Sequence, residues 1–174
     1  MRALIAIFAI GMATSVTGCV AAAVNTSTYA IKAMPRSELQ PRADAGDAAA
    51  QYELGKSWCC MGPGFDTQTA TEWFCKSARQ GNVDAMYELG RVYLGEISRT
   101  PAPGQKLRRA LTAQTSPVHA HLWLSMAAAG GHELAASRLA RLSESMTDEG
   151  RAASEKLAAA WRDAPCDHRA VFGE

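Results

Sequence analysis

This 174-residue sequence has almost no excess of charge of either sign. It contains 18 lysines and arginines and 17 aspartates and glutamates, which gives a formal net charge of +1. A nucleic-acid-binding protein needs a basic surface to neutralise phosphates, so this balance argues against that class of function. Aromatic side chains are also scarce, at 7%, whereas 48% of the residues are hydrophobic. The chain is long enough to bury one core and too short for two large domains.

An apolar run long enough to cross a membrane is missing from the N-terminal region. The run Ala3–Ala13 has eleven residues, whereas a helix needs about 20 to cross ~30 Å of hydrocarbon. It follows the positively charged Arg2 and precedes small and polar residues. This arrangement is typical of a secretory signal peptide rather than of a permanent transmembrane helix.

The four residues Val16-Thr17-Gly18-Cys19 resemble the lipobox of bacterial lipoprotein precursors. The resemblance implies that residues 1–18 are a signal peptide and that Cys19 is lipidated, with two or three acyl chains that hold the protein on a membrane. Val20 stands where such proteins carry an inner-membrane retention aspartate, which favours the outer membrane. We therefore expect a lipoprotein of the bacterial cell envelope that faces the periplasm, with residues 19–44 as a flexible tether.

A repeat of 35 residues is the strongest pattern in the chain. Residues 46–55 (GDAAAQYELG) align with residues 81–90 (GNVDAMYELG), and a third, weaker copy begins at Gly131. The third copy is displaced by 50 residues because residues 96–117 are inserted. Self-similarity at this period predicts a stack of similar structural units.

Each unit is predicted to be a pair of helices. Small and apolar residues recur at helical spacing in the first halves of two units, at Ala50, Leu54, Gly55 and Trp58 and again at Ala85, Leu89, Gly90 and Tyr93. The small residues would let neighbouring helices approach closely. Trp73 and Trp123, at equivalent places in the second halves, would fill the space between units.

These residues resemble the Sel-1-like repeat, a relative of the tetratricopeptide repeat, over about residues 45–146. The resemblance implies an all-α fold, a short α-α solenoid, acting as a non-catalytic protein-interaction adaptor. Three departures affect the expected curvature: Cys60 replaces a glycine, the insertion splits the second unit, and the third unit carries Ala140 and Ser143 in place of Gly and Tyr.

Residues 147–174 are predicted to form a capping helix and a tail. Thr147 would cap a helix over residues 148–163, because a hydroxyl at that position accepts a hydrogen bond from a free backbone N–H group. Leu157 and Trp161 form an i, i+4 apolar pair on this helix. We expect this pair to close the open end of the stack, which has no further neighbour.

Four cysteines follow the predicted lipidation site, at Cys59, Cys60, Cys75 and Cys166, and they allow three connectivities. Some secreted Sel-1-like proteins join the two helices of a unit, which would pair Cys75 with Cys59 or Cys60. However, Cys75 lies roughly 12 Å along the second helix, and bridged Cα atoms lie only ~4.4–6.8 Å apart. A bridge between the adjacent Cys59 and Cys60 would be strained, so we expect Cys166 to pair with one of them.

Metal-site spacing and hydrolase motifs are both missing. The four histidines and the cysteines form no C-x-x-C or H-x-x-x-H pair, so no metal or cofactor is expected, and His121 and His132 are expected to be solvated or to cap helices. No G-x-S-x-G elbow or supported S-x-x-K triplet occurs. Some cysteine-rich relatives were described as penicillin-binding or β-lactamase-like, which makes a hydrolase the third and least favoured class.

Basic and phenolic residues recur outside the apolar stripe. Lys56, Arg91 and Arg141 occupy the same position in three units, and Tyr52 and Tyr87 lie one turn before the first two. Stacking would align them as a ladder that could bind an acidic peptide or a free carboxylate. The alternative, which is favoured, is an ordinary solvated face.

The insertion is basic, with a local charge of +3. Residues 106–111 could form a short helix that contacts anionic lipid or cell-wall polymer, although a flexible interruption is the favoured interpretation. The sequence therefore predicts a lipid-anchored adaptor for an unidentified protein or peptide. The alternative is an envelope accessory protein that binds peptidoglycan directly.

Overall fold

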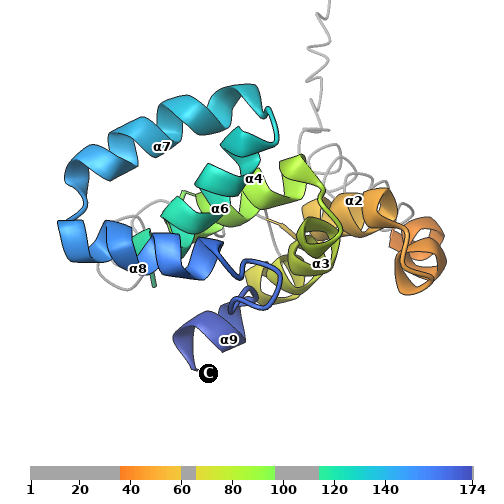
Figure 1. Cartoon of the computed structure of the whole chain (residues 1–174). Helices are drawn as coiled ribbons and strands as arrows, with labels where there is room; N and C mark the ends of the chain where they lie inside the picture. Colours follow the sequence, from red (N-terminus) through yellow and green to blue (C-terminus); the bar gives the residue numbers. More distant parts are fainter. Residues whose placement is uncertain (1–35, 60–65, 97–113, 174) are drawn as a thin grey trace, which may run out of the picture. The chain divides into compact units, whose positions relative to one another are not determined.

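The computed structural model describes residues 36–59, 66–96 and 114–173, which belong to one compact unit (Figure 1). Its helices are α2 (Ala48–Trp58), α3 (Thr67–Arg79), α4 (Val83–Tyr93), α6 (Pro117–Ala129), α7 (Glu133–Ser145), α8 (Asp148–Ala158) and α9 (His168–Phe172). Over the described ranges there is no β-strand, so the all-α prediction is confirmed. The predicted signal peptide, Cys19, Cys60 and the segment 106–111 lie outside these ranges.

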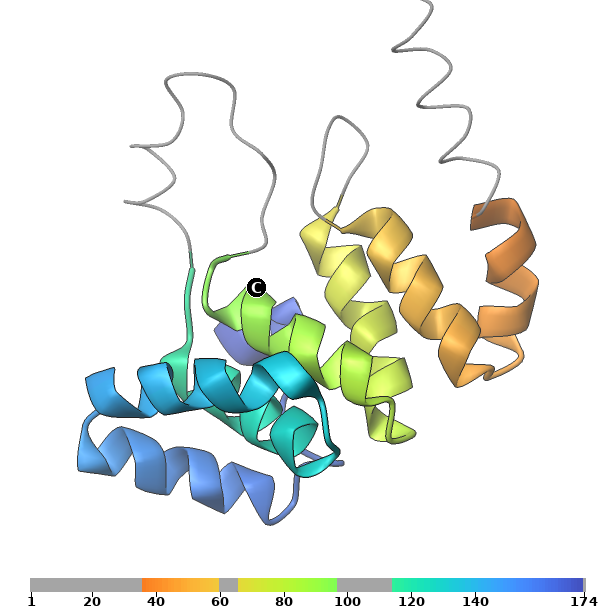
Figure 2. The same cartoon turned by 90° about the horizontal axis from the view of Figure 1, so that it is seen from above.

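The helices are stacked as pairs. Helix α2 packs on α3, and α4 packs on α6, while α3 also contacts α4 and α6 contacts α7. Figure 2 shows these elements following one another in chain order from α2 to α8. The prediction of a short α-α solenoid is therefore confirmed.

The same glycine turn recurs at each junction between units. Gly46, Gly81 and Gly131 have φ angles of 93°, 92° and 90°, a backbone conformation that glycine adopts without steric cost. The side chains of Asp47 and Asn82, which follow two of these glycines, accept hydrogen bonds from the backbone N–H groups three residues later at 3.1 and 3.0 Å. Equivalent residues of the two units therefore cap their helices in the same way.

Glycine also allows the paired helices to approach each other. A Cβ atom added at Gly55 would lie 2.6 Å from Cδ1 of Phe74, and one added at Gly90 would lie 2.7 Å from Cγ of Leu124. These distances are too short for an unstrained contact, so a larger residue at either crossing would force the neighbouring side chain to shift. The two pairs, α2–α3 and α4–α6, therefore share the close packing that the sequence predicts.

The two repeat tryptophans lie in corresponding environments. Trp73 is 8% exposed and packs in a cluster with Ala43, Ala50 and Leu54. Trp123 is fully buried in the larger cluster, which contains the equivalents of those three residues, Ala78, Ala85 and Leu89. The predicted wedging of units by indole rings is consistent with both sites.

The tether prediction is wrong for residues 36–44, because they are helical and belong to the packed body. Ala43 is 1% exposed, and the side chain of Gln51 donates a hydrogen bond to its carbonyl oxygen at 3.0 Å. Leu39 and Ala43 stand 35 residues before Phe74 and Ala78. The segment therefore matches the last two turns of a second helix in an earlier, incomplete unit.

The C-terminal helix is shorter than predicted. Thr147 does cap α8, accepting a hydrogen bond from the backbone N–H of Gly150 at 3.1 Å, and α8 packs on α6. However, α8 ends at Ala158, and Trp161 follows it in a turn. The half-buried indole of Trp161 still meets Trp123 edge-on, with ring centroids 6.3 Å apart.

The tail returns to the first unit, which makes the predicted disulfide pairing wrong. Cys166 is bonded to Cys75, with 5.7 Å between the two Cα atoms, and not to Cys59 or Cys60. The physical reason is that residues 164–168 pass directly over α3, where Cys75 lies at mid-helix. Cys59 also takes part in a disulfide.

Candidate protein-interaction surface

Equivalent polar residues of the first helices form one candidate surface, which we call the first-helix surface. It consists of Tyr52, Glu53 and Lys56 on α2, Tyr87, Glu88 and Arg91 on α4, and Arg138 and Arg141 on α7. The first two helices carry the same pattern, Tyr-Glu-x-x-cation, because they belong to aligned repeats. All five residues of the predicted ladder lie on these helices.

The ladder cations on α2 and α4 are paired with acids from their own helix. The Lys56 ammonium lies 2.9 Å from Oε1 of Glu53, and Arg91 donates to both carboxylate oxygens of Glu88 at 3.0 and 3.1 Å. Residues three apart on a helix are neighbours, so this pairing was readable from the sequence. It reduces the free positive charge that the ladder offers to an acidic partner.

Tyr87 joins two repeat units instead of projecting into solvent. It is 6% exposed, its ring stacks on His132 with centroids 3.9 Å apart, and its hydroxyl accepts a hydrogen bond from Nε of Arg138 at 2.7 Å. Arg138 also pairs with Glu96. The phenol therefore holds α4 and α7 together.

His132 has a different role from the one expected for it. It is the N-cap residue of α7, but its side chain makes no capping hydrogen bond. Its ring instead covers Tyr87, and Nε2 lies 3.6 Å from Oδ1 of Asp84. The side chain is therefore part of the junction between α4 and α7.

Tyr52 occupies the same position one unit earlier, in a more acidic setting. Burial, together with the carboxylates of Glu88 and Asp84, raises the pKa of Tyr52 to about 12. Burial also raises the pKa of Glu88. The carboxylates of Glu88 and Asp84 therefore lie near the phenol of Tyr52, whereas Arg91 and Arg138 are paired with Glu88 and Glu96.

Arg141 and Lys56 are the most available ladder cations. Both side chains are exposed. For Arg141, no ion pair is present within the part of the chain that the structure describes. A carboxylate partner would meet Arg141 directly but would have to compete with Glu53 at Lys56.

His121 links three helices and is neither solvated nor a cap. Nδ1 lies 2.9 Å from the hydroxyl of Ser154 on α8, and Nε2 lies 3.1 Å from that of Ser143 on α7. Ser143 donates its own proton to the carbonyl of Leu139, so it accepts from Nε2–H, and Nδ1 accepts from Ser154. Ser154 is 1% exposed, so this Ser–His contact offers no accessible nucleophile.

The described ranges contain no group of three or more His, Cys, Asp or Glu residues that could hold a metal ion. Nor do they include a helix with the length and apolar character needed to span a membrane.

A family model of the Sel1 repeat matches residues 48–82, 83–100 and 112–132. Three segments of the chain are therefore similar to the Sel1 repeat. The first match covers α2 and α3, and the next two cover α4 and α6, so the second Sel1 unit is split by the insertion as predicted. Helix α7, which carries Ala140 and Ser143, lies beyond the matched residues.

Sel1 repeats commonly mediate protein–protein interaction and generally form non-catalytic scaffolds. The match supports the coarse functional prediction, a repeat protein with protein partners. No curated protein matches the chain. The identity of a partner and the membrane anchor therefore stay predictions.

Proposed function

We propose that this protein is a non-catalytic interaction scaffold that is anchored to the bacterial cell envelope by lipid on Cys19. The anchor places it at the outer membrane, facing the periplasm. The proposal rests above all on the repetition of Tyr-Glu-x-x-cation on the aligned helices α2 and α4, continued by arginines on α7. A partner that lies across the first helices meets the same side chains at regular intervals.

The residues of the first-helix surface divide into two roles in this proposal. Tyr87 joins α4 to α7, because its ring is buried against His132, and Arg91 is neutralised by Glu88 of its own helix. Lys56 and Arg141 are exposed and contact the partner. The partner chemistry that fits them best is a peptide segment bearing carboxylates.

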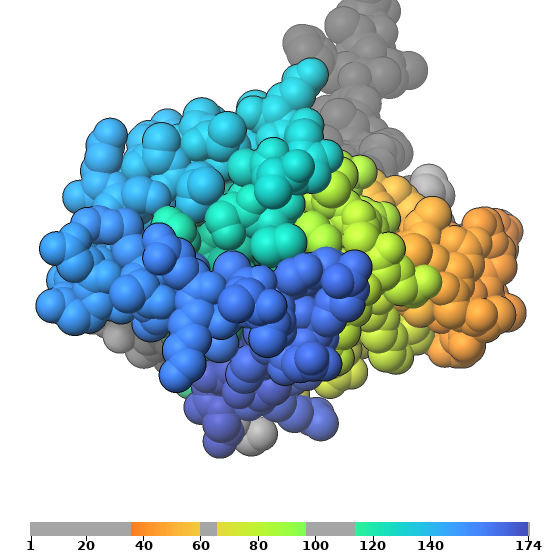
Figure 3. All heavy atoms as spheres, viewed as in Figure 1, coloured from red at the N-terminus to blue at the C-terminus, as the bar shows by residue number. Residues whose placement is uncertain are grey.

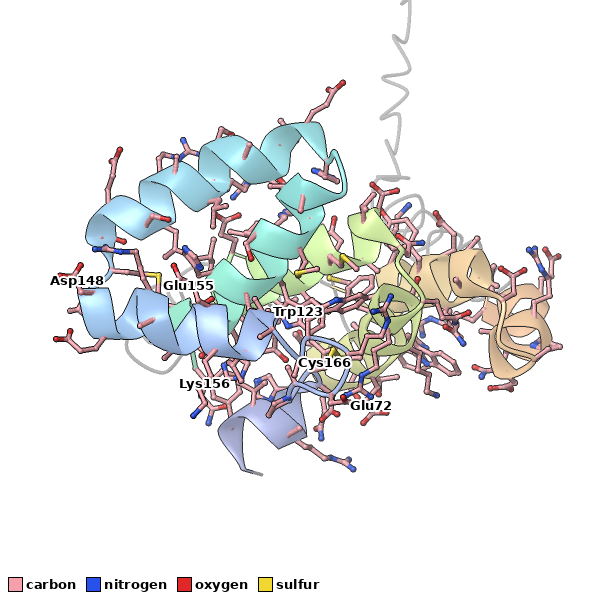
Figure 4. The ribbon with its side chains drawn as sticks, in the orientation of Figure 1. Glu72, Trp123, Asp148, Glu155, Lys156 and Cys166 are labelled. Carbon is pink, nitrogen blue, oxygen red and sulfur yellow. A yellow bond between two sulfur atoms is a disulfide. The ribbon has the colours of Figure 1, made fainter. Side chains whose placement is uncertain are left out.

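The surface is tested with Lys56→Glu and Arg141→Glu, made singly and together. Protein partners are captured by crosslinking in cells and compared with those of the unsubstituted chain. We expect the double variant to lose at least tenfold in captured partner, because reversed charges repel carboxylates. Lys156→Glu, on the exposed side of α8 (Figure 4), is the matched control. Equal capture by the double variant and the control would reject this surface.

The anchor is tested separately with Cys19→Ala. We expect the unsubstituted protein to incorporate labelled palmitate and to sediment with membranes, and the variant to do neither. Labelling that persists in the variant would refute lipidation at Cys19. Sedimentation with purified peptidoglycan in the absence of other proteins would instead support the glycan-binding alternative.

A further inference from the structure

The tail crosses one face of α3 in a regular register. Thr71, Cys75 and Arg79 follow one another at intervals of four residues, so they lie on one stripe of α3. They contact His168, Cys166 and Ala164, which follow one another at intervals of two residues in the opposite direction. Four helical residues rise about 6 Å, and over each such interval the tail advances by two residues until α9 begins at His168.

Two of the three levels are hydrogen bonds and the middle one is a disulfide. The hydroxyl of Thr71 accepts a hydrogen bond from the backbone N–H of His168 at 3.1 Å, and Arg79 donates to the carbonyl of Ala164 at 3.3 Å. Between them lies the Cys75–Cys166 disulfide. The hydroxyl of Tyr93, on α4, also donates to the carbonyl of Cys166. Alternate residues of an extended chain are thus recognised mainly through backbone groups.

The non-covalent part of this contact is small for the number of residues it orders. None of the α9 residues is buried, and only Ala164 and Cys166 of the segment 164–172 are. Every ordered residue loses backbone freedom, and a few hydrogen bonds and half-buried side chains offset only part of that loss. The disulfide is therefore the covalent link that supplements these contacts on α3.

The face of α3 and α4 beneath the segment carries hydroxyl groups that are paired with the tail. Thr71 and Tyr93 are fully buried although both carry hydroxyl groups, and each finds its tail partner in a backbone group. The C-terminal residues lie against the yellow-green part of the molecule, which contains α3 and α4 (Figure 3). Removal of the segment would expose two polar groups already spaced to pair with an extended peptide.

We propose that residues 164–172 are a redox-controlled cover over a peptide-binding face of α3 and α4. A dithiol reductant attacks one sulfur, forms a mixed disulfide and then closes its own disulfide. Two electrons and two protons pass to Cys75 and Cys166, which become thiols. The cover is then released, and an extended peptide binds in its register. The proposal depends neither on the lipid anchor nor on the first-helix surface.

The reductant reaches the Cys75–Cys166 disulfide from the side of α9. Cys75 and Cys166 are 4% and 0% exposed, so a dithiol does not reach the sulfurs while the cover is fully closed. The residues of α9, next to Cys166 in the chain, are the least buried part of the cover. Fraying of this short helix exposes the disulfide.

The experiment compares the oxidised full chain with the variant Cys75→Ala/Cys166→Ala, which leaves the disulfide of Cys59 intact. Hydrogen–deuterium exchange is measured on peptides from the cover and from α4 and α6. We expect exchange in residues 164–173 to rise at least tenfold in the variant, with α4 and α6 unchanged. Unchanged exchange in the cover would overturn the proposal, and so would an equal rise throughout the fold.

A second measurement tests the face itself. The probe is a fluorescent synthetic peptide of residues 162–173 with alanine in place of the cysteine. We expect it to bind the double variant at least tenfold more tightly than the oxidised chain, and Thr71→Val in the variant background to weaken that binding. Equal binding to the oxidised chain and the variant, or no binding to a variant whose cover is released, would refute the peptide-binding face.

Discussion

Substitution of the two helix-crossing glycines tests the packing of the repeat units. Gly90→Ala places a Cβ 2.7 Å from Cγ of Leu124 and 3.4 Å from the backbone nitrogen of the same residue. Overpacking of this kind costs about 1–3 kcal/mol. Alanine regains about 1 kcal/mol through its higher helix propensity. The free energy of unfolding should therefore fall by about 0–2 kcal/mol, and Gly55→Ala should behave in the same way against Phe74.

Gly150→Ala is the matched control, because it also lies within a helix. Its added Cβ would make only ordinary contacts, at 3.4 Å, with Met146 and Thr147. The propensity gain then stands alone, and this variant should be more stable by about 0.5–1 kcal/mol.

Urea unfolding of the three glycine variants measures the difference. One kcal/mol corresponds to a shift of roughly 0.3–1 M in the midpoint. Stabilisation of Gly90→Ala to the same extent as Gly150→Ala would refute the close approach of α4 and α6.

Three further predictions concern other parts of the fold. Trp161→Ala should lower the free energy of unfolding by about 1–3 kcal/mol, less than for a fully buried indole, because the ring is half-buried against Trp123; an unchanged thermal midpoint would remove its capping role. Asn82→Ala should cost about 1 kcal/mol through loss of the cap to Ala85, measurable by urea unfolding, with Asn82→Asp retaining most of the stability. Burial lowers the pKa of both His119 and His121, so the unfolded chain binds more protons, and stability should be constant above the ordinary histidine pKa and decline as the pH falls below it. Thermal midpoints at several pH values check this, and His121→Asn should reduce the decline.

The repeat pattern predicted the local structure well, for a physical reason. Gly46, Gly81 and Gly131 recur in the sequence because each unit ends its helix with the same left-handed turn. Gly55 and Gly90 recur because two helices cross at the same place in each pair. The turn and the helix crossing both depend on residues within one unit, so comparing the sequences of the units is enough to find them.

The 35-residue spacing also extends upstream of Gly46. Leu39 and Ala43 stand 35 residues before Phe74 and Ala78, and the structure shows residues 36–44 as a packed helix. Alignment from Gly46 onwards left this segment outside the repeats. Two prolines and several hydroxyl residues then made it resemble a tether, although the apolar pair was enough to cover α2 and Trp73.

The tail could not be placed from the repeat, because it has no counterpart in another unit. Cys166 and Cys75 are 91 residues apart, and their pairing depends on where the chain turns after Trp161. Spacing along one helix excluded Cys59 and Cys60 as partners of Cys75, but it said nothing about a segment that returns from the opposite end of the stack. Long-range contacts of this kind depend on the whole packing.

The sequence predicted where the candidate site lies, but only part of its charge pairing and burial. Alignment of Lys56 and Arg91 followed from the repeat, and the acids that neutralise them, Glu53 and Glu88, were visible at a spacing of three residues. The burial of Tyr87 was not visible, because His132 and Arg138 come from the next first helix. Neighbouring units therefore supply part of each residue's environment.

The connections within the two helix pairs show why an insertion leaves the solenoid intact. The backbone N–H of Asp66 donates to the carbonyl of Trp58 at 3.0 Å, and that of Ser116 donates to the carbonyl of Tyr93 at 2.9 Å. Trp58 and Tyr93 are repeat equivalents, as are Asp66 and Ser116, so connections of unequal length close with the same bond. Loop-closure entropy grows only with the logarithm of length, and the longer connection costs about 1 kcal/mol more. The packing of α4 on α6 exceeds that cost, so the second unit keeps the geometry of the first.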